Sequence, residues 1–337
     1  LLMALLAARG LDRPGAAAAA ALLAVCPEPV FYASVVKPYG GDLAAALLLL
    51  YLAVRLLEDP APRMALRAGF IAAGAAAVWF SYPAVFMAGG CAAVPMAVLA
   101  RRGDLARLAR FAPAAAAWGA SVLSLLGVML SRQDRYVSYW EGAFAPFPLG
   151  SAADRLWYAR TFRGLLVDPG GFQWHLLAGL VLLAGIPALW RARKDVAALL
   201  LAPLALAWAA SVLRRYPMEG RLMLFWTPAA YLLIGAGVSA ALSACARFGF
   251  RPAGVLLAAA LLVHPAWISA RYLVSPRTKE ELRPVLEEVA RRARPGDLVY
   301  VYYGAVPAFR YYRERAGLAS AEVREGADEL QTVVEPR

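Results

Sequence analysis

Apolar runs of about 20 residues recur along this chain, and only short breaks separate them. A transmembrane helix needs an apolar run of that length. Hydrophobic residues fill 61% of the 337 positions, and runs of this length are too numerous to be buried in one water-soluble core. The sequence therefore predicts a polytopic membrane protein whose membrane domain is all-α.

The breaks between the apolar runs are rich in arginine and account for the formal net charge of +12. A nucleic-acid-binding protein would instead gather its basic residues along one face or groove, so we predict no nucleic-acid partner. Under the positive-inside rule, short basic breaks lie in the cytoplasm. The predicted cytoplasmic breaks contain Arg9 and Arg13, Arg55 to Arg67, Arg101 to Arg110, Arg191 to Lys194, and Arg247 and Arg251.

This assignment requires roughly nine complete crossings of the membrane. The block 68–100 has basic residues on both sides, so it must cross twice, with a break at Ser81-Tyr82-Pro83. Leu1–Ala8 is too short to span, and we expect it to end a helix that begins upstream in a longer protein. The expected spans are Gly15–Val36, Asp42–Leu57, the two halves of Ala68–Ala100, Phe111–Leu130, Phe172–Trp190, Val196–Leu213, Leu222–Ala244 and Pro252–Ala270.

Two parts of the chain are less apolar. Within a membrane domain at 1–270, residues 131–171 mix aromatic and charged side chains, which predicts an exoplasmic loop with short amphipathic helices. Residues 271–337 predict a small exoplasmic α/β segment. Its expected elements are a helix at Thr278–Arg294, with Leu282, Val285, Leu286 and Val289 at helical spacing, a turn at Pro295–Asp297, a strand at Leu298–Tyr303 and a helix at Pro307–Arg315.

Two polar segments interrupt the apolar sequence on the predicted exoplasmic side. The first polar segment is Lys37–Asp42, and the second polar segment is Arg214–Arg221. Each connects two expected spans, so both can lie on one membrane face and form a single site. We therefore take these segments, together with Tyr82 at the break between two other spans, as the candidate site.

The cations of both segments have a functional and a structural interpretation. Lys37 can neutralise a phosphate or extend its charge to the membrane interface. Arg214, Arg215 and Arg221 go against the positive-inside rule, which an anionic ligand would explain because guanidinium groups bind phosphate with paired hydrogen bonds. Pairing with Glu219 or with lipid headgroups is the alternative.

The uncharged and acidic candidates also have two interpretations. Asp42 follows two glycines and precedes an apolar run, so it is a helix N-cap or a catalytic group. Tyr39 can stack on a sugar or belong to the aromatic belt of the membrane interface. Tyr82 can line the same outer cavity or anchor its turn.

No pattern of metal ligands is present in the sequence. Cys26, Cys91 and Cys245 are scattered in apolar runs, and His175 and His264 are isolated. We therefore predict no metal site and no cofactor. Whether a divalent cation takes part stays open.

Several short motifs resemble those of the bacterial family 39 glycosyltransferases. These are membrane enzymes of the GT-C type, related to protein O-mannosyltransferases and aminoarabinose transferases. The motifs are Pro29–Asp42 with Tyr32 and Ser34, Ser81–Ala84, Tyr216–Phe225 followed by Pro228, Arg283-Pro284, Pro295–Asp297 and Tyr302–Ala305.

The resemblance implies a GT-C-like helical bundle that transfers a sugar from a polyprenyl-phosphate donor to a glycan, lipid or protein acceptor. It also implies an acidic catalytic base in the first exoplasmic loop, upstream of Leu1, so this fragment is expected to be inactive. In such an enzyme Lys37 and the arginines would stabilise the leaving phosphate. Tyr39 and Tyr216 would shape the pocket, and Asp42 and Glu219 would orient the cations.

Two other functions stay open: a transporter or flippase, and a non-catalytic scaffold for envelope assembly. A transporter would place paired charges near the middle of the membrane, whereas the charges here lie near its outer face. With the alanine-, arginine- and glycine-rich composition, the resemblance implies the bacterial cytoplasmic (inner) membrane, with the C-terminal segment exoplasmic.

Overall fold

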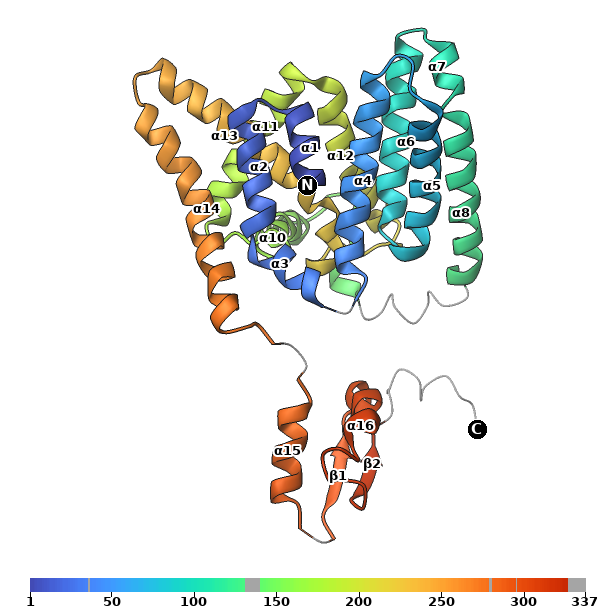
Figure 1. The fold of residues 1–337 in the computed structure, drawn as a ribbon, viewed down its shortest axis with the longest axis vertical. Helices are drawn as coiled ribbons and strands as arrows, with labels where there is room; N and C mark the ends of the chain where they lie inside the picture. The colour runs from blue at the N-terminus through green and yellow to red at the C-terminus, as the bar shows by residue number, and fades with distance from the viewer. Residues whose placement is uncertain (36, 131–139, 279–280, 295, 327–337) are drawn as a thin grey trace. The chain divides into compact units, whose positions relative to one another are not determined.

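The computed structural model describes residues 1–35, 37–130, 140–278, 281–294 and 296–326. The chain divides into two compact units, Leu1–Val274 and Ser275–Arg337, which we call unit 1 and unit 2. Unit 1 is helical, and unit 2 combines helices with a two-stranded sheet (Figure 1). The expected boundary at 270/271 thus lies only a few residues from the division between the two units.

Unit 1 consists of helices joined mostly by short turns. Its first half contains α1 (Leu2–Gly10), α2 (Arg13–Val25), α3 (Pro27–Ser34), α4 (Tyr39–Glu58), α5 (Met64–Phe80), α6 (Ala84–Arg101), α7 (Leu105–Ala109) and α8 (Ala112–Leu130). Its second half contains the 3-10 helix η1 (Glu141–Ala143), α10 (Ala152–Val167), α11 (His175–Ala192), α12 (Lys194–Val212), the 3-10 helix η2 (Gly220–Trp226), α13 (Thr227–Arg247) and α14 (Arg251–Val274).

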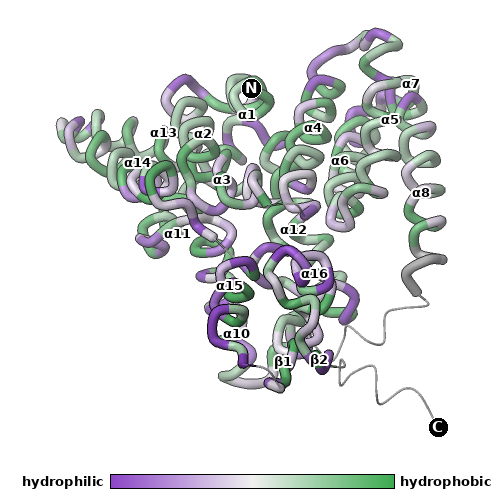
Figure 2. The backbone as a smooth tube through the Cα atoms, turned by 60° about the horizontal axis from the view of Figure 1, so that its bottom comes forward, coloured by the Kyte–Doolittle hydropathy of each residue, from purple (hydrophilic) through white to green (hydrophobic). Residues whose placement is uncertain are grey.

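Seven helical segments in the described part of the chain are long and apolar enough to cross a membrane. The bent pair α2 and α3 would make an eighth span, and α5, an apolar helix of 17 residues, is slightly shorter than the others. Figure 2 shows hydrophobic residues along α4, α6 and α14, whereas α15 of unit 2 is largely hydrophilic. The predicted all-α polytopic membrane fold is therefore confirmed.

The first expected span is not one continuous helix. Gly15–Val36 was expected to cross as a unit, but α2 ends at Val25 and α3 starts at Pro27 with a bend of 48°. Pro27 has no amide hydrogen and disfavours a helical residue before it, so Cys26 adopts an extended conformation and interrupts the helix. Val36, the expected last residue of this span, lies outside the described residues.

The segment expected to form an exoplasmic loop contains one long helix, α10. Its first nine residues, 131–139, lie outside the described residues. Ser151 begins α10 with a capping box, in which its hydroxyl accepts from the Asp154 amide while the Asp154 carboxylate accepts from the Ser151 amide. Figure 1 shows α10 nearly end-on, so it crosses the direction of the long helices.

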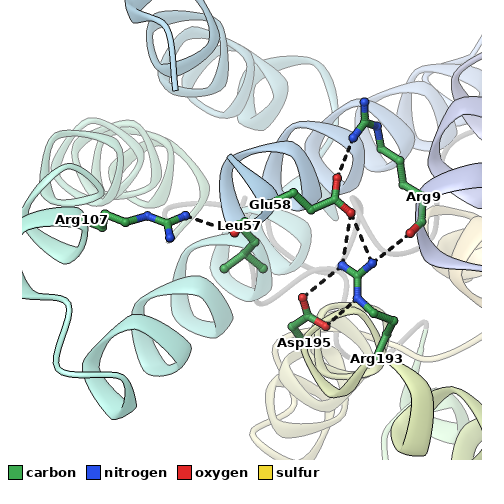
Figure 3. A network of polar contacts seen from close by, with 6 residues as sticks. All are labelled: Arg9, Leu57, Glu58, Arg107, Arg193 and Asp195. Atoms are coloured by element: carbon green, nitrogen blue, oxygen red, sulfur yellow. Dashed lines mark hydrogen bonds and ion pairs between the residues drawn. The ribbon is translucent and has the colours of Figure 1, made fainter. Parts of the chain in front are cut away.

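The long helices run in alternating directions, which brings most of the arginine-rich breaks to one end of unit 1 (Figure 1). We call this the basic end. Figure 3 shows Glu58, at the end of α4, between Arg9 of α1 and Arg193 before α12. The nitrogen to oxygen distances are 2.6 Å to Arg9 and 3.2 Å to Arg193. Arg193 also pairs with Asp195 at 3.2 Å, so this network joins three helices.

The Arg193 side chain should stabilise unit 1, because it bridges Glu58, Asp195 and the carbonyl of Arg9. About one third of this side chain is exposed, so we expect Arg193→Gln to lower the free energy of unfolding by only about 1 kcal/mol. Thermal unfolding in detergent measures this loss. Arg13→Gln, at an exposed position of the same end, should change nothing, and an equal effect of both substitutions would show that the network contributes no stability.

The closest helix contacts surround α13. A Cβ atom added at Gly237 would overlap the carbonyl oxygen of Val181 in α11, and one added at Gly185 in α11 would overlap the carbonyl oxygen of Leu233. Every residue of α13 from Thr227 to Val238 is buried. Small residues therefore let the backbones of α11 and α13 touch, which is the usual way in which membrane helices associate.

We expect Gly237→Ala to destabilise unit 1 by about 3 kcal/mol, because the new methyl group can fit only if two backbones separate. Gly119→Ala is the matched control, since a Cβ atom at that helical position has no neighbour within 4 Å. The control should be neutral or slightly stabilising, because alanine favours helices more than glycine. Thermal unfolding of both variants decides the question, and equal melting temperatures would contradict the close contact.

Unit 2 has its own small core. It contains α15 (Arg283–Arg292), β1 (Leu298–Val301), the 3-10 helix η3 (Tyr303–Ala305), α16 (Val306–Tyr312) and β2 (Glu322–Glu325). The strands pair in parallel, with Leu298 opposite Glu322. The buried side chains of this core are Leu286, Val301, Phe309 and Leu318.

Several expected features of unit 2 were wrong in detail. The helix begins at Arg283 instead of Thr278, since Pro284 occupies its first turn, where a missing amide hydrogen costs nothing. Val285, expected on the apolar face, is mostly exposed. β2 was not expected, because three of its four residues are charged and its partner strand lies more than 20 residues away. Pro295 and part of the expected helix, residues 279–280, lie outside the described residues.

Candidate functional site

The first polar segment joins α3 to α4 at the end of unit 1 opposite the basic end (Figure 1). α4 begins at Tyr39, and the Asp42 amide already donates to the Pro38 carbonyl at 2.9 Å. The expected N-cap role of Asp42 is therefore wrong. Asp42 lies in the first turn of the helix, where the exposed amide groups favour a negative charge.

The second polar segment follows α12, which ends in a turn with Arg214 in the left-handed region at φ +56°. The Arg214 and Arg215 amides donate to the Ser211 and Ala210 carbonyls, both at 2.8 Å. The chain then leaves the helix, and the Tyr216 hydroxyl donates to the Leu222 carbonyl. This last bond connects the middle of the segment to η2, in which Leu222 lies.

The two polar segments meet. The guanidinium carbon of Arg221 lies 5.6 Å from the centre of the Tyr39 ring, within the range of a cation–π contact. A third connection joins them, because Tyr82, between α5 and α6, lies with its ring centre 5.8 Å from that of Tyr216. Three breaks that are far apart in the sequence thus form one cluster, which we call the junction site: Tyr39, Asp42, Ser81, Tyr82, Tyr216 and Arg221.

Polar atoms in the junction site are buried without well-formed hydrogen bonds to the described residues. Asp42 is only 5% exposed and Ser81 only 1% exposed. Asp42 Oδ1, Ser81 Oγ and Arg221 Nε have no well-formed hydrogen bond there. The Ser81 side chain lies close enough to interact with the Asp42 carboxylate, so Arg221 Nε is the atom of the three that most needs a partner from water or a polar ligand. Ser81 was expected only as part of a break between spans.

Two tyrosines of the site, Tyr82 and Tyr216, have raised pKa values and stay neutral to higher pH than usual. Burial raises the pKa of Tyr216 well above its ordinary value, and the nearby Asp42, Tyr82 and Tyr39 raise it further. Burial also raises the pKa of Tyr82, although Arg215 opposes that shift. Both hydroxyl groups therefore serve as neutral hydrogen-bond donors and acceptors near the buried carboxylate.

Some of the expected site residues lie elsewhere. Arg214 is exposed and approaches Glu141 of η1 at 3.8 Å, and Glu219 lines a separate cavity together with Arg160. Lys37 and Arg215 are exposed. Arg215 nevertheless lies near Tyr82 of the junction site, and Lys37 donates its amide to the Val35 carbonyl at 2.8 Å. The Glu219 carboxylate makes no ion pair with any arginine within the described ranges, so an orienting role for it finds no support.

No group of three or more potential metal ligands occurs among the described residues. Comparisons of the chain with protein-family models, with curated proteins and with solved structures find no match. The fold therefore defines a class, a multi-pass helical membrane protein, and the site has to be interpreted from its own geometry.

Tyr216 stabilises the second polar segment through a hydrogen bond of its hydroxyl, whereas Tyr39 contacts Arg221 and Tyr32 through its ring. We expect Tyr216→Phe to lower the free energy of unfolding by about 1 kcal/mol, because the Leu222 carbonyl loses its donor in a buried place. Tyr39→Phe is the control, since its ring contacts with Arg221 and Tyr32 persist. Thermal unfolding compares the two variants, and a Tyr216→Phe protein as stable as wild type would contradict the bond.

Proposed function

We propose that the protein is a membrane glycosyltransferase that takes a hexosyl or pentosyl group from a polyprenyl-phosphate donor. The observation that carries the proposal is the convergence of the two polar segments at the junction site. That convergence sets the Arg221 guanidinium beside the ring of Tyr39, and Asp42 lies buried about one turn further along α4. A lipid-linked donor has its phosphate at the membrane surface, where a site at the ends of membrane-spanning helices can reach it.

The chemistry needs a cation where negative charge develops. The acceptor oxygen forms a bond to the anomeric carbon, and the bond from that carbon to the phosphate oxygen breaks. The hydroxyl proton passes to a carboxylate base, and the lipid phosphate leaves with the bonding electron pair. Arginine and lysine groups that are held in place stabilise such a phosphate more in the transition state than in the bound donor.

We assign this role first to Arg221, whose Nε lacks a partner among the described residues and whose charge is held against Tyr39. Lys37 and Arg215 lie on the same connections and are the next candidates. In this proposal Tyr82 and Tyr216, whose rings lie with their centres 5.8 Å apart, contact the sugar or the phosphate. Arg214 is less favoured, because its side chain faces Glu141.

Transfer of a radiolabelled sugar from a polyprenyl-phosphate donor tests the assignment, with the full-length protein in membranes. We expect Arg221→Ala to lower the rate about 100-fold, the usual loss when one charge-stabilising donor is removed. Lys37→Ala should lower it as well. Arg155→Gln, an exposed arginine of α10, is the control and should keep the wild-type rate.

Wild-type transfer by both Arg221→Ala and Lys37→Ala would contradict the phosphate-binding role. Absence of any transfer by the wild-type protein, together with movement of the lipid across the membrane, would instead identify a transporter. A folded variant is verified by size-exclusion chromatography before each assay.

A further inference from the structure

A polar cavity and an apolar groove lie side by side next to α10. The cavity, of about 290 Å³, is lined by Arg160 and Thr161 of α10 and by Glu219 of the second polar segment. The groove, of about 450 Å³, runs between α10 and the part of α12 from Leu201 to Trp208. Four residues line both: Trp157, Thr161, Leu165 and Met218. The two spaces are therefore adjacent and share one wall.

The groove has a rigid aromatic wall. The Trp208 indole donates to the Tyr158 hydroxyl at 2.9 Å, and that hydroxyl donates to the Pro146 carbonyl at 3.0 Å. The Trp157 indole donates to the Gly142 carbonyl at 2.8 Å. Because the polar atoms of these side chains are already bonded, the wall offers the groove apolar ring faces. α12 is one of the candidate membrane spans, so hydrocarbon chains of a bilayer can reach the groove.

The cavity carries one charge of each sign, whereas the two polar segments as a whole carry more cations than carboxylates. Arg160 and Glu219 supply one positive and one negative group, and neither makes an ion pair with another residue that the structure describes. A carboxylate accepts from hydroxyl groups, a guanidinium donates to hydroxyl oxygens, and the face of Trp157 packs against C–H groups. This balanced set suits a neutral, hydroxylated head group. The cations Lys37, Arg215 and Arg221 suit a phosphate better.

We propose that the cavity and groove together bind a glycolipid, with its sugar head beside Glu219 and Arg160 and its apolar chain along α12. Its role as the sugar acceptor rests on the proposed function, whereas its binding does not. The acceptor of this protein is then a membrane lipid with a free sugar hydroxyl instead of a protein.

Fluorescence quenching tests the binding, because Trp157 and Trp208 line the groove. The probe is an alkyl glucoside with bromine atoms on its chain, added to the protein in phosphatidylcholine nanodiscs. We expect saturable quenching that Trp208→Phe reduces. An alkyl phosphate with the same brominated chain and a brominated phosphatidylcholine are the comparison probes, and both should quench less than the glucoside at equal concentration.

Ala205→Phe fills the groove and should weaken glucoside binding at least about tenfold, equivalent to roughly 1.4 kcal/mol. Ala209→Phe, an exposed position one turn further along α12 that does not line the groove, is the matched control and should bind normally. Glu219→Gln, at an exposed position, removes the carboxylate proposed to accept from the sugar hydroxyl groups and leaves the volume of the cavity nearly unchanged. It should also weaken glucoside binding.

Three results would overturn the proposal. Stronger binding of the alkyl phosphate would make this the donor site. Equal and unsaturable quenching by all three probes would mean that bulk lipid fills the groove. Unchanged glucoside binding by both Ala205→Phe and Glu219→Gln would exclude this location. The assay needs no donor and no turnover, so its outcome is independent of the Arg221 transfer assay.

Discussion

The arrangement of unit 1 depends on the contact between the backbones of α11 and α13. In a membrane the lipid tails are as apolar as the side chains, so helices gain little from the hydrophobic effect when they associate. Glycines such as Gly185 and Gly237 let the two backbones approach closely, so dispersion contacts between the helices take the place of the hydrophobic effect. The N-terminal half of α13 is buried on all sides, so it forms the central helix of unit 1 against which the other helices pack.

The junction site is connected to the N-terminal end of α13. The second polar segment leads through η2 directly into α13, and the Trp226 indole at the end of η2 donates to the Leu200 carbonyl of α12 at 2.8 Å. Leu224 of η2 packs with Phe31 and Tyr32 of α3. The backbone around Arg221 is therefore fixed by the contact of η2 with α12 and by its continuation into α13, and the Arg221 side chain contacts Tyr39 of α4.

Prolines explain why polar groups gather at these places. Pro38, Pro83 and Pro217 lie at the three connections that form the junction site. Pro38 and Pro83 directly precede α4 and α6, and Pro217 lies between α12 and η2. Where a helix ends, its backbone groups need partners, so irregular backbone and polar side chains occur together. The sequence predicted these breaks well, because proline, tyrosine and arginine stand out against long apolar runs.

Other features of the site could not be predicted from the sequence. Hydropathy indicates that a residue lies in a membrane helix but not which neighbour it faces, so the Tyr39–Arg221 contact, 182 positions apart, depends on packing alone. Asp42 carried a helix-capping pattern, yet Pro38 started the helix earlier. Arg160 and Trp157 were not candidates because they lie in the less apolar segment 131–171, and only the folded chain brings Glu219 to the same cavity.

The second polar segment forms a wall shared by two chemically different spaces. Tyr216 and Arg221 contact Tyr82 and Tyr39 in the junction site, whereas Met218, Glu219 and Gly220 between them line the cavity. The Met218 amide donates to the Ala143 carbonyl at 2.9 Å, which fixes this middle part. The proposed phosphate site and the proposed glycolipid site are thus formed by parts of the same segment of the chain.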